Sequence, residues 1–154
     1  MKPIIDQDLA SLLDQTLWTK DMPWSEVQIL SRYFRLYHAG QDEWLFREGD
    51  PPEFMGLLLK GRLEILKTCA QSHDIKRIAE VRPQQSFGEM AMIDNQVRSA
   101  SARVTQPAIF LLTSQKQLFA LAEQHPKLAF KFLWQLTHLI SQRLRSASLQ
   151  LTGL

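Results

Sequence analysis

"FGEMAMIDNQVRSASA", residues 87–102, is the most informative stretch of this chain. It opens with a Gly-Glu pair, continues through an apolar turn and a polar loop, and carries only three charged side chains: Glu89, Asp94 and Arg98. Surface loops usually carry more charge than this, and buried strands usually exclude it. A glutamate and an arginine nine residues apart in such small, apolar surroundings indicate a pocket for a ligand that has both hydroxyls and negative charge.

The residue types of this stretch fit such a ligand. Gly88 lets the backbone turn tightly, and "GEMAMI" predicts a short helix whose first-turn N–H groups favour an anion. Arg98 offers a rigid fork of donors to the same anion, whereas the acceptor-only carboxylate of Glu89 suits a sugar hydroxyl. Together they describe a site for a phosphorylated sugar. A Glu89–Arg98 salt bridge across the loop is the alternative, and the residues alone leave both open.

Composition limits the class of protein. A chain of 154 residues suits one domain with a real core, and 45% hydrophobic with 22% charged residues are ordinary globular values. The net charge of +2 is too small to indicate a nucleic-acid partner. No acidic residue follows Glu123, although Lys127, Lys131, Arg143 and Arg145 do. We interpret these cations as complementing a helix dipole, with a surface for nucleic acid or acidic lipid as the alternative.

The chain is expected to be cytoplasmic. Cys69 is the single cysteine, so no intramolecular disulfide can form, which suits a reducing compartment. Asp6 and Asp8 interrupt the region where the apolar core of a secretory signal would begin. The longest apolar runs, "FMGLLL" and "AIFLL", are far shorter than a membrane span.

The pattern of apolar residues divides the chain into three parts. Residues 1–36 read as a helical segment, with one helix over Leu9 to Leu17 and a second from about Met22. Residues 37–113 contain the short runs "EWLFR", "FMGLLL", "RLEILK", "IKRIAEV", "SARVT" and "AIFLLT", separated by turn-forming residues. Several short strands at this spacing predict a sandwich or jelly-roll barrel.

Residues 114–154 return to helical periodicity. Ser114 and Gln117 form a candidate capping box, and Pro126 suits the first position of a long final helix. That helix carries an apolar stripe at Ala129, Leu133, Leu136, Ile140, Leu144, Ala147 and Leu151. The stripe can face the domain's own core or a second copy of the chain.

Signatures of catalysis and metal binding are missing from the sequence. None of the four histidines is paired with another ligand at metal spacing, and no G-x-S-x-G elbow, P-loop or H-E-x-x-H motif occurs. Glu48 and Asp50 lie between Gly49 and two prolines, where turn formation accounts for them. We therefore expect no enzyme, no catalytic residue, no metal and no cofactor.

"FGEMAMIDNQVRSAS" resembles the phosphate-binding cassette of cyclic nucleotide-binding domains, whose usual pattern is F-G-E-L-A-L, a short loop, then P-R-A/S-A-T/S. The Gly88-to-Arg98 spacing is that of the cassette. "FREGDPPEFMGLLLKGRLEIL" and "HPKLAFKFLWQLTHLISQRL" resemble further parts of the family, so the resemblance covers residues 33–149. It implies a mainly β fold: an antiparallel jelly-roll β-barrel (double-stranded β-helix) with N-terminal helices, a cassette at 87–102 and a C-terminal B/C helix pair.

The resemblance also implies the ligand contacts. Glu89 would accept from the ribose 2′-hydroxyl with Gly88 shaping its approach, and Arg98 would pair with the exocyclic oxygens of the cyclic phosphate. The remaining expected contacts are Met90, the backbone N–H groups of Ala91 and Ser99, and Ser148, which would reach the adenine edge from late in the final helix. The chain departs from the family pattern at Val97, where a proline is usual, and at Gly56, which indicates a bulge or a close approach.

The expected function is that of an intracellular cyclic nucleotide sensor. Ser99 has a hydroxyl that fits cAMP or cGMP, and we expect cAMP, with cGMP possible. The final helix would report binding to an unidentified protein partner or a downstream domain, and would make the chain a homodimer. The alternatives are a degenerate, non-binding dimerisation module and a nucleic-acid-binding regulator acting through the basic final helix. The last lacks the aromatic interleaving of such surfaces, so no nucleic-acid partner is expected.

Overall fold

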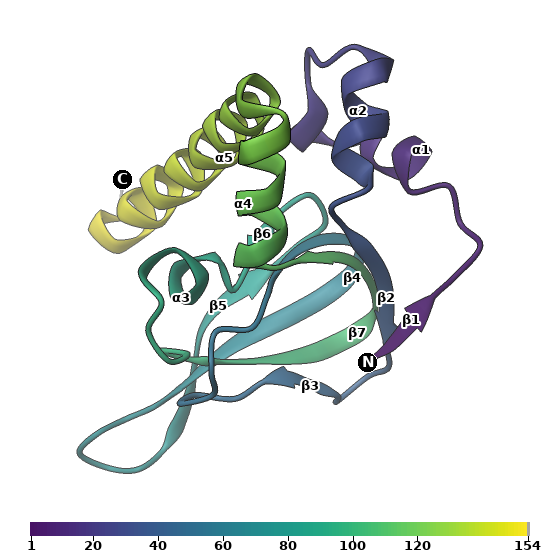
Figure 1. Cartoon of the computed structure of the whole chain (residues 1–154). Coiled ribbons are helices and arrows are strands. Elements are labelled where there is room, and N and C mark those ends of the chain that lie inside the picture. The colour runs from purple at the N-terminus through teal and green to yellow at the C-terminus, as the bar shows by residue number, and fades with distance from the viewer. Residues whose placement is uncertain (154) are drawn as a thin grey trace.

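Seven strands form the β-sheet of the computed structural model, which describes residues 1–153. They are β1 (Lys2–Ile4), β2 (Arg35–Ala39), β3 (Trp44–Phe46), β4 (Met55–Thr68), β5 (Ile75–Val81), β6 (Ser86–Phe87) and β7 (Ser101–Thr113). The main path runs β1-β2-β7-β4-β5, with β3 paired to β7 and β6 to β4, and every pairing is antiparallel. Figure 1 shows the sheet curling into a barrel with the helices above it. The mainly β jelly-roll with flanking helices is confirmed.

Two long strands replace four of the short runs expected from the sequence. "FMGLLL" and "RLEILK" belong to one strand, β4, and "SARVT" and "AIFLLT" belong to β7. The predicted turn between "FMGLLL" and "RLEILK" was wrong, because Gly61 takes a φ of +93° inside β4 while the pairing with β7 shifts register between Leu58 and Leu63. Such bulges bend a strand without ending it, so β4 wraps around the barrel.

The N-terminal segment is not wholly helical. The expected first helix is a short α1 (Leu9–Asp14) followed by the 3-10 turn η1 (Leu17–Thr19), and α2 spans Trp24–Ser31. Residues 2–4 instead form β1, which pairs with β2, and β2 begins at Arg35. An edge strand of three residues is held by backbone hydrogen bonds, so it leaves no periodic side-chain signal in the sequence.

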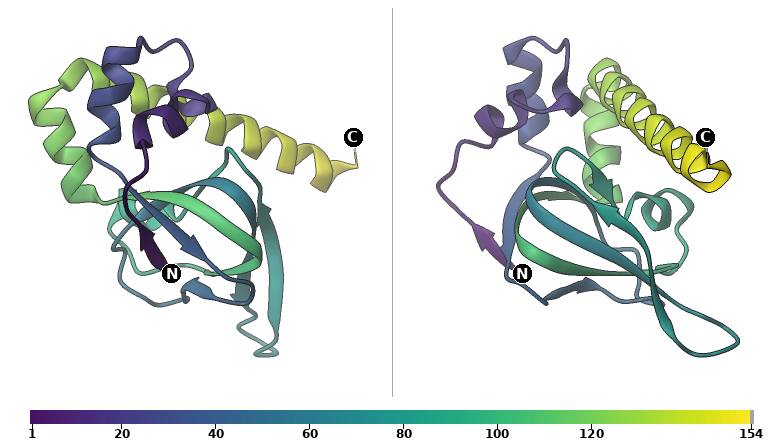
Figure 2. Two further views of the ribbon diagram at one scale, coloured as in Figure 1. Left: turned by 90° about the vertical axis from the view of Figure 1, so that its right-hand side faces the viewer. Right: turned by 180° about the vertical axis from the view of Figure 1, so that it is seen from behind.

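The core consists of two apolar clusters. One fills the barrel around Phe110 and Phe87, and the other joins the barrel to the helices around Trp18, Phe34 and Phe132. Figure 2 shows the N-terminal helices and the final helices side by side over this second cluster. The close approach predicted at Gly56 is confirmed, because a Cβ there would overlap the ring of Phe87.

The C-terminal helices are α4 (Gln115–Gln124) and α5 (Pro126–Thr152). The Ser114 hydroxyl caps α4 by accepting from the Gln117 N–H at 3.2 Å, and Pro126 lies in the first turn of α5, as expected. Within residues 1–153, no helix is both long enough and apolar enough to cross a membrane.

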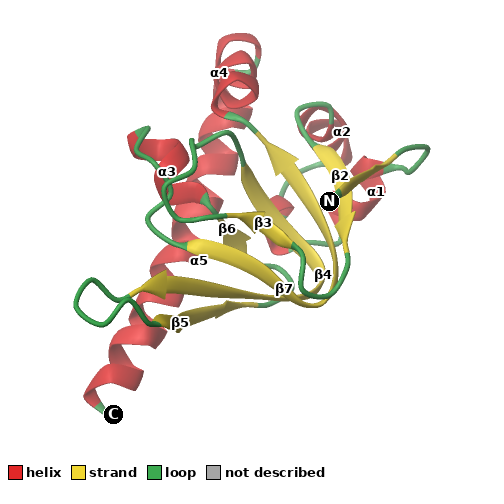
Figure 3. Ribbon diagram, turned by 90° about the horizontal axis from the view of Figure 1, so that it is seen from below, coloured by secondary structure: helices red, strands yellow, loops and turns green. Residues whose placement is uncertain are grey.

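The apolar stripe of α5 divides between two environments. Ala129 and Leu136 are buried in the protein's own core, whereas Leu133, Leu144 and Leu151 are exposed. Figure 3, a view from below, shows α5 passing behind the sheet and past its edge toward the C-terminus. The stripe therefore contributes buried residues to the core only at Ala129 and Leu136, while Leu133 between them and the leucines of the second half stay exposed.

Candidate ligand-binding site

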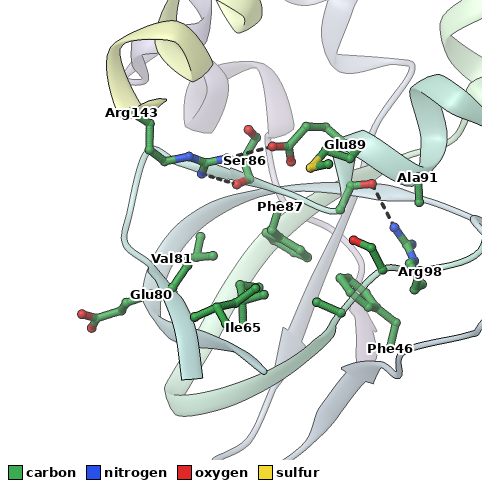
Figure 4. Close-up of a pocket in the computed structure, with 16 residues that line it drawn as sticks. Phe46, Ile65, Glu80, Val81, Ser86, Phe87, Glu89, Ala91, Arg98 and Arg143 are labelled. Atoms are coloured by element: carbon green, nitrogen blue, oxygen red, sulfur yellow. Dashed lines mark hydrogen bonds and ion pairs between the residues drawn. The ribbon is translucent and has the colours of Figure 1, made fainter. Parts of the chain in front are cut away.

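A cavity of about 250 Å³ lies between the barrel, the cassette and α5 (Figure 4). β5, the start of α3 (Glu89–Asp94), the 98–100 loop and one residue of α5 enclose it. Its walls are formed by Phe46, Ile65, Ile78, Ala79, Glu80, Val81, Ser86, Phe87, Gly88, Glu89, Met90, Ala91, Arg98, Ser99, Ala100 and Arg143. Most side chains on the barrel side are apolar, with Glu80 of β5 the charged exception there, and the other charged residues, Glu89, Arg98 and Arg143, lie at the cassette and on α5.

Gly88 sets the geometry of the cassette. It has a φ of +73° at the residue that precedes α3, a conformation that favours glycine. A Cβ at this position would lie 2.7 Å from Nη1 of Arg98 and 3.4 Å from the carbonyl of Phe54. The predicted short helix after Gly88 is confirmed, and glycine is required because the Arg98 guanidinium packs directly against the turn.

Arg98 is the buried cation of the cavity, with only 2% of its surface exposed. Its Nη1 donates to the Gly88 carbonyl at 2.9 Å and its Nη2 to the Phe54 carbonyl at 2.6 Å. The guanidinium stacks over the Phe46 ring, 4.0 Å from its centroid, and its Nε is buried without a hydrogen-bond partner. Burial lowers the pKa of Arg98, while Asp50, Glu53 and Glu89 oppose that shift. This cation has no ion-pair partner among the described residues, so it retains donors for an anion.

Glu89 is the buried anion of the cavity, 6% exposed. Its Oε1 accepts from Nη2 of Arg143 at 2.8 Å, and its Oε2 is buried with no donor among the described residues. The alternative of a Glu89–Arg98 salt bridge is not what the structure shows, because the partner of Glu89 is Arg143. A buried acceptor without a donor is costly, and Oε2 suits the hydroxyl of a ligand.

Arg143 is the site residue that sequence reasoning missed. It extends from α5, donates to the Ser86 carbonyl at 2.7 Å and pairs with Glu89, so one side chain ties the helix to β6 and the cassette (Figure 4). From the sequence, Arg143 is interpreted as one of the cations that complement the helix dipole, with a surface for nucleic acid or acidic lipid as the alternative. Arg143 lies seven residues, about two helical turns, after the core residue Leu136. This spacing could have indicated that Arg143 lies on the same face of the helix as Leu136.

Six of the seven predicted site residues line the cavity, and Ser148 does not. The six are Gly88, Glu89, Met90, Ala91, Arg98 and Ser99. Ser148 is exposed on α5, five residues beyond Arg143. Five residues turn a helical side chain by about 140°, so the two cannot point the same way. Their roles toward a ligand stay predictions, and the structure does not bring Ser148 to the cavity.

A short turn clamps the backbone on either side of Arg98. The Gly49 N–H donates to the Arg98 carbonyl at 2.8 Å, and the Arg98 N–H donates to the Asp50 carbonyl at 2.8 Å. The Glu48 N–H donates to the Ser101 hydroxyl at 2.8 Å. Glu48 and Asp50 thus act in the turn, as predicted. In the part of the chain described, no three His, Cys, Asp or Glu side chains lie close enough to hold a metal ion.

Comparison with known proteins agrees with this geometry. The family model for the cyclic nucleotide-binding domain matches residues 36–125. The chain is 30% identical over 128 residues to the cyclic AMP receptor protein of Thermus thermophilus, covering 82% of this chain and 56% of that protein.

Solved structures are similar over most of the chain. A cyclic nucleotide-binding domain from Methylobacillus flagellatus has a TM-score of 0.83 at 31% identity, covering 94% of this chain and 81% of that one. The catabolite activator protein of Thermus thermophilus has a TM-score of 0.73 at 26% identity, covering 89% of this chain and 62% of that one. The chain thus spans a little over half of the curated relative. It belongs to the cyclic nucleotide-binding domain family.

Proposed function

We propose that the chain senses cAMP, which binds in the cavity between Glu89 and Arg98. The observation that carries this proposal is a pair of buried groups without partners on one cavity: Oε2 of Glu89, an acceptor, and Nε of Arg98, a donor. A cyclic nucleotide supplies what both lack, because its ribose has a hydroxyl to donate and its phosphate has oxygens to accept. These unmet groups also argue against a degenerate, non-binding module.

The purine would lie on the apolar wall of the cavity. Ile65, Ile78 and Val81 line that wall, and aliphatic side chains are suitable partners for the face of a base. Ser99 also lines the cavity, and a serine hydroxyl is compatible with either purine nucleotide. The name of the Thermus relative, a cyclic AMP receptor protein, supports cAMP over cGMP.

The signal would leave the site through α5. A ribose hydroxyl that donates to Glu89 shares this carboxylate with Arg143, and Arg143 belongs to α5. Arg143 also donates to the Ser86 carbonyl. A ligand hydroxyl on Glu89 would therefore change the relative strength of the two hydrogen bonds by which Arg143 attaches α5 to β6 and the cassette. We infer that α5 transmits this change to a protein partner or to a downstream domain.

We further infer that α5 pairs with a second copy of the chain. Phe130, Leu133, Leu144 and Leu151 are exposed along one side of the helix, with Thr137 and Ser141 between them. That side carries no charged residue, so two copies can meet there without like-charge repulsion. Leu136 has no part in this face, because it is buried in the protein's own core.

Calorimetric titration of the purified chain with cAMP, cGMP and a cyclic dinucleotide tests the proposed function. We expect saturable binding of cAMP at one site per chain, weaker binding of cGMP, and none of the bulkier dinucleotide. Linear 5′-AMP, which adds a second phosphate charge, is the matched control and should bind more weakly than cAMP. Absence of heat with all cyclic nucleotides would establish the non-binding module instead.

A further inference from the structure

The loop that leads from α3 to Arg98 has few restraints of its own. Asn95 ends α3 with a φ of +56°, and the next fixed contact is the Gln96 N–H, which donates to Asp94 Oδ1 at 3.0 Å. Val97 is 59% exposed, and its amide makes no hydrogen bond to the residues that the structure describes. The backbone of Arg98 and Ser99 must nevertheless be held in place if these residues are to meet an anion.

Lys67 holds the far side of this loop from another element. It lies near the end of β4, and its Nζ donates to the Ser99 carbonyl at 2.6 Å. Glu48 lies beside it, with Oε1 3.5 Å from Nζ, and Oε2 accepts from the Thr68 N–H at 3.1 Å. The Thr68 N–H and the Lys67 charge lower the pKa of Glu48. The carboxylate therefore keeps its charge beside Lys67 at neutral pH.

We propose that Lys67, supported by Glu48, is a positioning residue of the nucleotide site, which fixes the Ser99 backbone before the ligand arrives. Lys67 does not line the cavity, whereas Ser99 does, so its effect on binding must pass through the loop. This inference rests on the proposed function. Ordering the loop in advance removes a conformational-entropy cost that binding would otherwise bear.

An exposed ion pair by itself is a weak contact, and the Lys67 side chain is about half exposed. The hydrogen bond from the Lys67 ammonium to the Ser99 carbonyl is the stronger of the two contacts of Lys67. A charged donor forms a stronger hydrogen bond than a neutral donor does. The turn at residues 48–50 already clamps Arg98 through backbone bonds. Lys67 adds a hydrogen bond to Ser99, the next residue of the cavity wall, and among residues 1–153 no other side chain donates to that carbonyl.

The test compares Lys67→Met with Lys76→Met. Methionine keeps much of the lysine stem but has no donor. Lys76 lies opposite Lys67 in the β4–β5 hairpin, and its ammonium makes no hydrogen bond or ion pair among residues 1–153. We expect Lys67→Met to weaken cAMP binding about three- to tenfold, the loss of one hydrogen bond, and Lys76→Met to leave it unchanged. Amide exchange at Ser99–Ser101 in the ligand-free protein should become faster only in Lys67→Met.

A rescue variant separates positioning from simple loss of a contact. Proline at position 97 restricts the loop without involving Lys67, and Val97 is not among the residues with positive φ. Val97→Pro should therefore restore most of the lost affinity in the Lys67→Met background. Wild-type affinity in Lys67→Met, or no recovery on adding Val97→Pro to folded protein, would overturn the inference. If the wild type binds no cyclic nucleotide, the proposed function fails. Amide exchange in the ligand-free protein tests the positioning role independently of that result, and unchanged exchange rates at Ser99–Ser101 in Lys67→Met would refute it.

Discussion

Glu89 is a buried carboxylate with one partner in the chain. One oxygen accepts from Arg143, and the other, which has no donor among the described residues, is the one that we propose for a ligand hydroxyl. The sequence could predict Gly88, Glu89 and Arg98, because they form a local motif whose chemistry is readable within eleven residues. It could not predict Arg143, which lies 54 residues from Glu89 and meets it only because α5 packs over the cassette. The resemblance implies a contact from late in the final helix to the adenine edge, and Ser148 is the residue predicted for it, but the rotation of α5 does not bring Ser148 to the cavity.

The Arg143–Glu89 pair should contribute to stability without any ligand. Arg143→Met leaves the Glu89 carboxylate buried without a donor, so the free energy of unfolding should fall by about 1–3 kcal/mol. Glu89→Gln adds its own donor, and the double variant should therefore lose less than the sum of the single losses, with a coupling of about 1 kcal/mol. Urea denaturation measures all four proteins. Arg145→Met, an exposed cation on the same helix, is the control, and strictly additive losses would disprove the pairing.

At the scale of elements, α5 joins the core to an uncovered surface. Phe132 is fully buried and meets the Phe34 ring edge-on at 5.6 Å, whereas Phe130, two residues earlier, is 65% exposed. The sequence predicted the helices well, since the Ser114 cap and Pro126 are local signals. It divided β4 and β7 wrongly, because bulges and an internal Pro107 look like turns until the neighbouring strand is known.

The two phenylalanines of α5 should respond differently to truncation. Phe132→Ala opens a cavity in the core that joins helices to barrel, and it should cost about 3–5 kcal/mol of stability. Phe130→Ala removes an exposed ring that stacks on Trp134 and should change the stability of the monomer by less than about 0.5 kcal/mol. Thermal unfolding monitored by circular dichroism compares them. Equal losses of stability in the two variants would contradict the orientation of α5 in this structure, in which Phe132 faces the core and Phe130 faces outward.

At the scale of the whole molecule, the arrangement of barrel and helices places one end of α5 in the core and leaves the other available. The jelly-roll could be predicted because the cassette resembles that of a family whose members have this fold. The contact between α5 and the cavity could not be predicted, since it depends on how the helix lies over the barrel. The exposed side of α5 carries Phe130, Leu133, Leu144 and Leu151, apolar side chains that the monomer leaves exposed.

We expect the chain to be a dimer at micromolar concentration, and light scattering coupled to size exclusion measures this directly. Leu133→Glu and Leu144→Glu put charge on the uncovered side and should yield folded monomers. Leu149→Glu is the matched control, because Leu149 is also exposed but lies about 140° around the helix from Leu144. A wild-type monomer, or a Leu149→Glu variant that dissociates like the other two, would contradict the proposed interface.

Calorimetric titration of Arg98→Ala with cAMP, beside the wild type, tests the central claim most directly. If the Arg98 guanidinium pairs with the cyclic phosphate, its loss leaves a desolvated anion unpaired. Such a loss costs roughly 2–5 kcal/mol, so affinity should fall by about 30-fold to several thousand-fold. Arg98→Lys keeps the charge but not the planar fork and should recover only part of the loss. Circular dichroism confirms that each variant is folded. Wild-type affinity for cAMP in folded Arg98→Ala protein would contradict the assignment of this cavity.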